Sequence, residues 1–143
     1  MSLKPVILLV EDNPDHAEFI RRVLSDDAVE VVIQPDGQAA LEYLRDRGNR
    51  PSLVILDIKL PKKDGFEVLA ILRTNERLRD LPVVMLSTSF NPDEIRRAYR
   101  LGVNSFVSKP IDFLEFNKKV KQIKEFWLGV AELPLPDEAR SAP

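Results

Sequence analysis

The chain has 143 residues, of which 44% are hydrophobic and 31% charged, and a formal net charge of −2. This length suits one ordinary domain, and the near-neutral charge gives no electrostatic reason to expect nucleic-acid binding. The chain has no cysteines, which excludes disulfides, thiolate metal sites and cysteine nucleophiles. No apolar run reaches membrane-spanning length, and the first residues lack a signal-peptide pattern, so we expect no membrane association and a cytoplasmic protein.

Short apolar runs alternate along the chain with amphipathic segments. The runs predict five strands, at Val6–Val10, Val29–Ile33, Leu53–Leu56, Val83–Leu86 and Ser105–Val107. The amphipathic segments predict five helices, at about residues 15–26, 37–47, 64–75, 91–101 and 112–128. This alternation predicts a doubly wound α/β domain with a five-stranded parallel sheet. Because Glu30 places a charge within the second run, we expect that strand at the sheet edge.

Several residues mark the expected helix ends. Asn13 and Asn91 each precede a proline, as at a capped helix start, and Gly102 follows the fourth helix. Gly129 is expected to end the last helix. That helix has one apolar stripe, made of Phe113, Phe116, Val120, Ile123 and Trp127.

The predicted elements define one domain at residues 5–128. Residues 129–143 have no periodicity and are expected to form a mobile tail. We expect no separate output domain.

Polar side chains stand at or just after the ends of four predicted strands. They are Glu11 and Asp12, Asp57, Ser87, and Lys109. The carboxyl ends of parallel strands line one edge of a sheet, where ligands bind. Adjacent buried acids require a compensating cation, and carboxylate oxygens suit Mg²⁺. Aspartate also forms aspartyl-phosphates, so the pattern predicts a crevice for a divalent cation and a phosphoryl group.

Each of these residues also has an ordinary structural interpretation. Acids favour helix N-termini, aspartate and serine cap loops, and most lysines are solvated. Separately, none of them indicates a function. Their common position at one sheet edge is what favours a shared site.

The ordered set resembles the receiver domain of bacterial two-component response regulators. The matching stretches are Val10–Asn13, Asp57–Gly65, Leu81–Ser87 and Phe106–Pro110, and the resemblance covers about residues 5–128. It implies a flavodoxin-like strand order 2-1-3-4-5 with helices on both sheet faces. A narrower likeness, to single-domain regulators that serve bacterial phytochromes, is carried by Leu60–Gly65, Ser87–Ser89 and Phe126–Leu128 followed by Leu133-Pro134.

The resemblance implies a phosphoacceptor and a metal site. Asp57 would accept the phosphoryl group from a histidine kinase. The narrower likeness implies that this kinase is a bacterial phytochrome. Mg²⁺ or Mn²⁺ would be bound by Asp12, Asp57 and the Lys59 backbone carbonyl, with Glu11 acting through water. The protein would assist its own phosphorylation and dephosphorylation, as a switch and not as an enzyme acting on other molecules.

The resemblance also implies a switch. Lys109 would contact the phosphoryl group, Ser87 would hydrogen-bond to it, and Phe106 would move inward in response. The Lys109–Pro110 peptide bond would be cis. Two residues depart from the commonest family pattern: Ser87 replaces threonine, and Phe106 lacks the phenolic hydroxyl often found at its position.

The family signals through the fourth helix, fifth strand and fifth helix, and we expect a homodimer through that face. Its basic residues are Arg96, Arg97, Arg100, Lys118, Lys119, Lys121 and Lys124, which a plain interpretation leaves simply solvated. Phe126–Leu128 is a run of large apolar residues that cannot all face one core. On the first helix, Phe19 and Arg22 are candidates for kinase contact, with core packing the alternative for Phe19. His16, the only histidine, is expected to be incidental.

Three other functions fit less well. A haloacid-dehalogenase-type phosphatase needs an acid two residues after Asp57, where Lys59 stands. A flavodoxin-like nucleotide or flavin binder needs a phosphate-cradling turn, which Glu11-Asp12 would repel. A pseudo-receiver interaction module is expected to lack one of the site residues. A phosphate-relay intermediate has the same chemistry and stays open.

Overall fold

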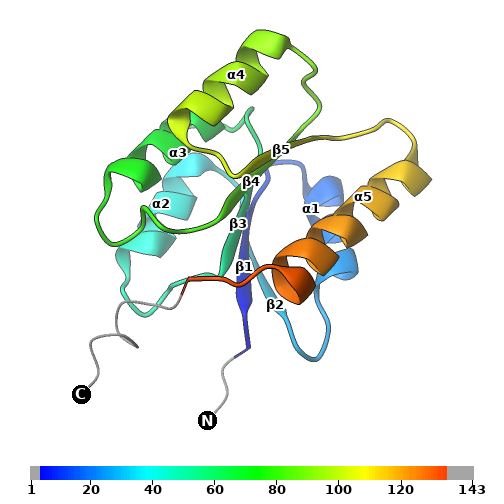
Figure 1. Ribbon diagram of the computed structural model, residues 1–143, viewed down its shortest axis with the longest axis horizontal. Helices are drawn as coiled ribbons and strands as arrows, with labels where there is room; N and C mark the ends of the chain where they lie inside the picture. Colours follow the sequence, from blue (N-terminus) through cyan, green and yellow to red (C-terminus); the bar gives the residue numbers. More distant parts are fainter. Residues whose placement is uncertain (1–3, 135–143) are drawn as a thin grey trace.

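A five-stranded parallel sheet forms the centre of the computed structural model, which describes residues 4–134 (Figure 1). The strands are β1 (Val6–Val10), β2 (Glu30–Gln34), β3 (Leu53–Leu56), β4 (Val83–Ser87) and β5 (Ser105–Ser108). Their order is β2-β1-β3-β4-β5 and every pairing is parallel. The predicted fold class, strand order and edge position of β2 are confirmed.

Five helices cover the two faces of the sheet. They are α1 (Pro14–Leu24), α2 (Gly37–Arg45), α3 (Gly65–Thr74), α4 (Pro92–Leu101) and α5 (Phe113–Glu125). In Figure 1, α1 and α5 lie on one side of the strands, and α2, α3 and α4 lie on the other. Two apolar cores result, because alternate residues of each strand point to opposite faces.

The central strand β1 shows how the two cores are separated. Its Leu8 and Val10 pack into the core under α2 and α3, whereas Ile7 and Leu9 pack into the core under α1 and α5. All four side chains are fully buried. Burial on both faces leaves no room for chemistry along the strands, so polar groups concentrate where the strands end.

The predicted helix caps are present. The Asn13 side chain accepts hydrogen bonds from the backbone N–H groups of Asp15 and His16, at 2.9 and 3.1 Å. The Asn91 side chain accepts from the Asp93 N–H at 2.9 Å. Gly102 ends α4 with a φ of 101°, a left-handed conformation that glycine adopts without steric cost.

The end of the last helix differs from the prediction. The α-helix ends at Glu125 and continues as a π-helical turn, Phe126–Val130, so Gly129 lies inside this turn and does not end the helix. The Ala131 N–H donates to the Phe126 carbonyl at 2.7 Å and closes the wider turn. Trp127 and Leu128 pack against the core, while Phe126 is 50% exposed.

The start of the same helix also differs. Phe113 is 64% exposed and not part of the buried stripe that Phe116, Val120 and Ile123 form. Its ring packs on Phe19 of α1, with 4.3 Å between ring centroids. The first turn of α5 contacts α1 in place of the sheet, because it begins beyond the ends of the strands (Figure 1).

Two sequence-based expectations concern the remaining chain. The tail predicted at residues 129–143 is described only up to residue 134, and residues 135–143 lie outside the described structure. Among residues 4–134, the helices are all too short or too polar to cross a membrane.

Candidate functional site

The three predicted acids meet at the carboxyl edge of the sheet. Val10 of β1 pairs with Leu56 of β3, so the residues that follow these two strands are neighbours. The Asp57 N–H extends this pairing by donating to the Val10 carbonyl at 3.1 Å. Carboxylate oxygens of Glu11, Asp12 and Asp57 lie within 4.8 Å of one another. The strand register therefore produces the acidic cluster that the sequence pattern predicts.

Lys109 reaches this cluster from β5, on the far side of β4. Its backbone N–H donates to the Ser87 carbonyl at 2.6 Å, which fixes the lysine one residue beyond the end of β5. Its ammonium donates to a carboxylate oxygen of Glu11 and to Asp57 Oδ2, the latter at 3.1 Å. Lys109 is only 4% exposed. A buried ammonium is tolerated only when it is paired and hydrogen-bonded, and these two acids meet that requirement.

The prediction of a cis Lys109–Pro110 peptide bond is wrong for this structure, because residues 4–134 contain no cis peptide bond. A trans bond is the preferred state before proline by about 0.5–1 kcal/mol. The main-chain hydrogen bond from Lys109 to Ser87 already directs the lysine to the acids without a cis bond.

Both carboxylate oxygens of Glu11 already accept hydrogen bonds from within the protein. Burial raises the pKa of its carboxyl group, and the hydrogen bond and charge of Lys109 act in the opposite direction. One carboxylate oxygen accepts from the Lys109 ammonium, and the other accepts from the Asn13 N–H at 3.2 Å. The exposed Asp12 and the partly exposed Asp57 therefore have more capacity to bind a cation directly than Glu11 has.

The loop after β3 fits a cation as well. Asp57 Oδ1 accepts from the Ile58 N–H at 2.7 Å, which fixes the carboxylate in orientation. Two residues further on, the Lys59 carbonyl accepts no hydrogen bond from any residue of the described chain 4–134. Carboxylate and free carbonyl oxygens are the ligands that Mg²⁺ and Mn²⁺ use, so the donor set present here fits such an ion.

Gly65 explains why this loop stays close to Asp57. The first residue of α3 packs directly on the Asp57 main chain, where an added Cβ would lie 2.2 Å from the Asp57 carbonyl oxygen. The Gly65 N–H donates to the Ile58 carbonyl at 2.8 Å. Asp64 starts the helix by accepting from the Glu67 N–H at 2.9 Å. The Asp64-Gly65 pair thus shapes the loop between β3 and α3.

Ser87 and Phe106, the two residues of the predicted switch, lie at the end of β4 and within β5. Ser87 ends β4 and is 1% exposed, and its hydroxyl oxygen accepts from the Ser89 N–H at 3.2 Å. Phe106 in β5 is partly buried against the core under α3 and α4. Its backbone N–H donates to the Tyr99 hydroxyl of α4 at 3.1 Å. This bond links β5 directly to the last turn of α4.

His16 belongs to the site, although the sequence indicates only an incidental residue. Its Nδ1 lies 3.4 Å from the Lys109 ammonium nitrogen. Burial lowers the pKa of His16, and the positive charge of Lys109 lowers it further. The usable signal was its position in the first turn of α1, directly after the strand end that carries Glu11 and Asp12.

A cavity of about 480 Å³ opens beside Lys109. Most of its lining is apolar and comes from α1, the segment after β4 and the segment joining β5 to α5. Phe19 is one of the lining residues. Its ring centroid lies 4.3 Å from that of Phe113 and 5.1 Å from that of Phe116. Ile111 at the rim is fully exposed. Arg22, the other predicted contact residue, is ion-paired with Glu18 at 3.2 Å.

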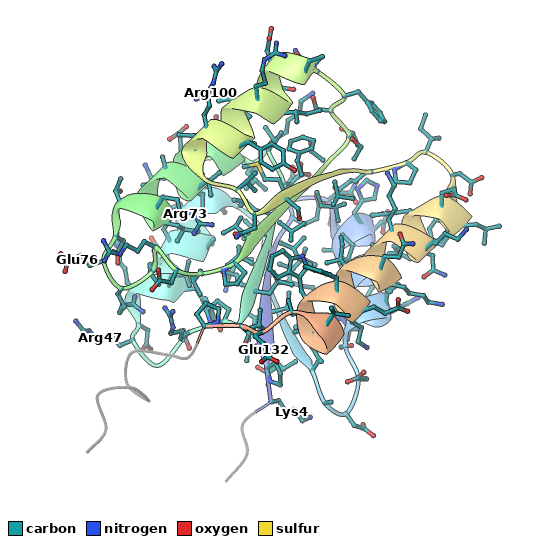
Figure 2. The ribbon with its side chains drawn as sticks, in the orientation of Figure 1. Lys4, Arg47, Arg73, Glu76, Arg100 and Glu132 are labelled. Carbon is teal, nitrogen blue, oxygen red and sulfur yellow. The ribbon has the colours of Figure 1, made fainter. Side chains whose placement is uncertain are left out.

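The basic residues of α4 and α5 are largely paired within the protein. Arg97 lies over the Phe66 ring of α3, 4.2 Å from its centroid. Lys119 donates to the Ser108 carbonyl at 3.0 Å, and Lys124 pairs with Asp26 at 2.6 Å. Arg100 extends outward from α4 (Figure 2). Several of the basic residues therefore have partners within the protein, which differs from the interpretation that leaves them simply solvated.

Comparison with known proteins gives a consistent result. The family model for the response regulator receiver domain matches residues 7–121. The "Probable methanogenesis regulatory protein FilR2" of Methanothrix harundinacea is 47% identical over 92% of this chain and 88% of that protein. The response regulator Rcp1 of Synechocystis is 40% identical over 90% of this chain and 92% of its own length.

Solved structures agree with the sequence relatives. The phosphorylated cyanobacterial phytochrome response regulator RcpA superposes with a TM-score of 0.88 at 43% identity, covering 93% of this chain and all of the other. The Mn²⁺-bound form of Rcp1 superposes with a TM-score of 0.87 at 40% identity, covering 92% and 99% of the two chains.

Proposed function

This chain belongs to the family of response regulator receiver domains, and from that premise we propose that it accepts a phosphoryl group from a histidine kinase onto Asp57. The observation that supports this most directly is the position of the Lys109 ammonium. It lies buried at 3.1 Å from Asp57 Oδ2, at the edge of the acidic cluster. Asp57 is partly exposed, so a phosphoryl donor can reach it. The fixed positive charge of Lys109 would stabilise the highly charged phosphoaspartate that forms.

In the proposed reaction, a carboxylate oxygen of Asp57 attacks the phosphorus atom of a phosphohistidine. A P–O bond forms, the P–N bond breaks, and the imidazole of the kinase leaves. Asp12, Asp57 and the Lys59 carbonyl would hold Mg²⁺ or Mn²⁺, which would supply positive charge for the phosphoryl oxygens. The Lys109 ammonium would supply a second positive charge to the same oxygens. Catalysis would therefore depend on positioning and electrostatic stabilisation.

Signalling from Asp57 would begin at Ser87. The product gains about −1.5 to −2 charges at neutral pH. The Ser87 oxygen accepts from the Ser89 N–H, so the hydroxyl's own proton can be donated to the phosphoryl group. Phe106 lies on the neighbouring strand, and its N–H is bonded to Tyr99. A rearrangement of Ser87 and Phe106 would therefore reach α4 and the α4–β5–α5 face as a shift between two conformations.

The kinase would approach through the aromatic cavity beside Lys109. This surface joins α1 to the segment before α5 and exposes Ile111 and Phe113 next to the phosphoacceptor. An apolar helix surface of a kinase would fit an apolar groove of this kind. Because RcpA is a phytochrome response regulator, a light-sensing histidine kinase of the phytochrome class is the kinase we propose.

A homodimer through the α4–β5–α5 face is the proposed output assembly. Tyr99 on α4 and Phe126 after α5 are each half exposed. Sedimentation velocity with and without phosphorylation tests this assembly. We expect a dimer in at least one state, and monomers in both states would contradict it.

Phosphorylation itself is tested by mass spectrometry after incubation with acetyl phosphate and Mg²⁺. The unmodified chain should gain one phosphoryl group, and Asp57→Asn should gain none. Omission of Mg²⁺ should abolish the gain. If Asp57→Asn is modified to the same level as the unmodified chain, the proposal is wrong.

A further inference from the structure

The buried Lys109 ammonium has three N–H donors and three acceptors. The first two acceptors are Glu11 and Asp57, and the third is the Nδ1 atom of His16 at 3.4 Å. Buried donors are hydrogen-bonded in nearly all native proteins, and among residues 4–134 His16 is the third group within hydrogen-bond distance of this ammonium. His16 therefore completes the set of partners that hold Lys109 in the site.

The imidazole ring is itself held in place. The backbone N–H of His16 donates to the Asn13 side chain at 3.1 Å, and this bond fixes the first turn of α1. The ring packs edge-on against Phe116 of α5, with 6.1 Å between centroids and 77° between planes. Phe116 is buried in the core. Since α1 and α5 both constrain the ring, its Nδ1 atom has a defined position relative to Lys109.

The surroundings of His16 favour the neutral form of its ring. Lys109 faces it from the end of β5, Asp57 faces it from the end of β3, and Asp12 and Asp15 flank it along the chain. The acids raise its pKa, but burial and Lys109 outweigh them and lower it. The contact that α5 makes with the ring is the uncharged Phe116.

We infer that His16 is a positioning residue for phosphoryl transfer: its Nδ1 atom accepts the third proton of Lys109 and keeps the ammonium between Glu11 and Asp57. The inference rests on the proposed function of Asp57. Lysine has a flexible four-carbon stem, so two acids alone leave the ammonium free to move toward Glu11. A third acceptor on α1 restricts that movement and keeps the charge where the phosphoryl oxygens arrive.

Three substitutions separate the acceptor from the bulk of the ring. His16→Asn keeps an acceptor, because the amide oxygen takes the place of Nδ1 and has no charge at any pH. His16→Leu keeps the bulk without an acceptor, and His16→Ala removes both. The readout is the rate of Asp57 phosphorylation by acetyl phosphate at saturating Mg²⁺, with thermal unfolding as the control for folding.

We expect His16→Leu and His16→Ala to slow phosphorylation about five- to tenfold, the effect of losing one hydrogen bond of ordinary strength. His16→Asn should stay within about twofold of the unmodified chain. The unmodified rate should fall as pH drops through the His16 pKa, because protonation places a second cation beside Lys109, and His16→Asn should lack that step. Equal rates in all four proteins would refute the inference while leaving phosphorylation of Asp57 intact.

A second measurement is independent of phosphorylation. His16 is the only histidine of the chain, so one set of ring ¹⁵N signals reports on it. The spectrum should show the neutral tautomer with the proton on Nε2. Lys109→Met should change the Nδ1 shift and raise the pKa of His16. A proton on Nδ1 near neutral pH, or no response to Lys109→Met, would overturn the inference even if Asp57 proved not to be phosphorylated.

Discussion

Two cations hold this fold together at opposite ends of the sheet, and they differ in the charge of their acceptors. Arg73, labelled in Figure 2, lies near the amino ends of β4 and β5. Its guanidinium donates to the carbonyls of Gly102, Arg79 and Leu81 at 2.8, 3.1 and 2.8 Å and to the Asn104 side chain at 2.9 Å. Lys109 lies at the carboxyl ends and donates to carboxylates and an imidazole.

The difference separates a structural cation from a functional one. The acceptors of Arg73 are neutral and fixed in the main chain or in Asn104, so nothing in the cell changes their charge. Burial lowers the pKa of Arg73, yet arginine stays charged in proteins. One acceptor of Lys109 is the partly exposed Asp57 carboxylate, which would gain negative charge on the proposed phosphorylation. On that proposal, the same type of contact stabilises at one end of the sheet and switches at the other.

Lys109→Met should have the largest effect. Removal of one preorganised positive group from a site that stabilises developing charge costs about 100- to 1,000-fold in rate. We expect Asp57 phosphorylation by acetyl phosphate to slow by that factor, measured by mass spectrometry over time. Binding of Mg²⁺ should persist, because the acids remain.

Arg73→Met makes the matched change at the other end of the sheet. Four acceptors lose their charged donor, which should lower the free energy of unfolding by about 3 kcal/mol, measured by urea denaturation. The folded variant should be phosphorylated at the normal rate. A rate loss as large as that of Lys109→Met would remove the distinction between the two cations.

Gly65→Ala should weaken both stability and chemistry. The added Cβ would lie 2.2 Å from the Asp57 carbonyl oxygen, so the start of α3 must move away from the phosphoacceptor. We expect a loss of about 2 kcal/mol in unfolding free energy, typical of overpacking, with slower phosphorylation. Gly48→Ala is the control, because an added Cβ there meets only a side-chain oxygen of Asp46 at 3.3 Å.

The smallest expected effect is stabilisation by the metal ion. A ligand that binds only the folded state at ten times its dissociation constant stabilises it by about 1.4 kcal/mol. Mg²⁺ or Mn²⁺ should therefore raise the thermal midpoint of the unmodified chain and of Arg73→Met alike. Asp12→Asn should abolish the shift, and an undiminished shift in that variant would place the ion elsewhere.

The prediction from sequence succeeded where a pattern repeats and failed where packing decides. Short apolar runs located the strands, and three- and four-residue spacing of apolar residues located the α-helices, to within a few residues in the described part of the chain. The order of polar residues at strand ends located Glu11, Asp12, Asp57 and Lys109 in one site. Phe113 was misplaced because its spacing suits the core stripe, although α5 begins at this residue and its first turn packs on α1 and not on the sheet.

The sequence by itself determined the alternation of strands and helices, their parallel pairing and the residues placed at the carboxyl edge. These follow from local periodicity and from the rules for parallel sheets, which need no knowledge of long-range contacts. Tertiary structure decided the partners of each charge: that Lys109 donates to Glu11 as well as Asp57, that His16 takes its third proton, and that Arg73 binds neutral carbonyls. Such partners come from segments up to 98 residues apart, and only the packed chain brings them within hydrogen-bond distance.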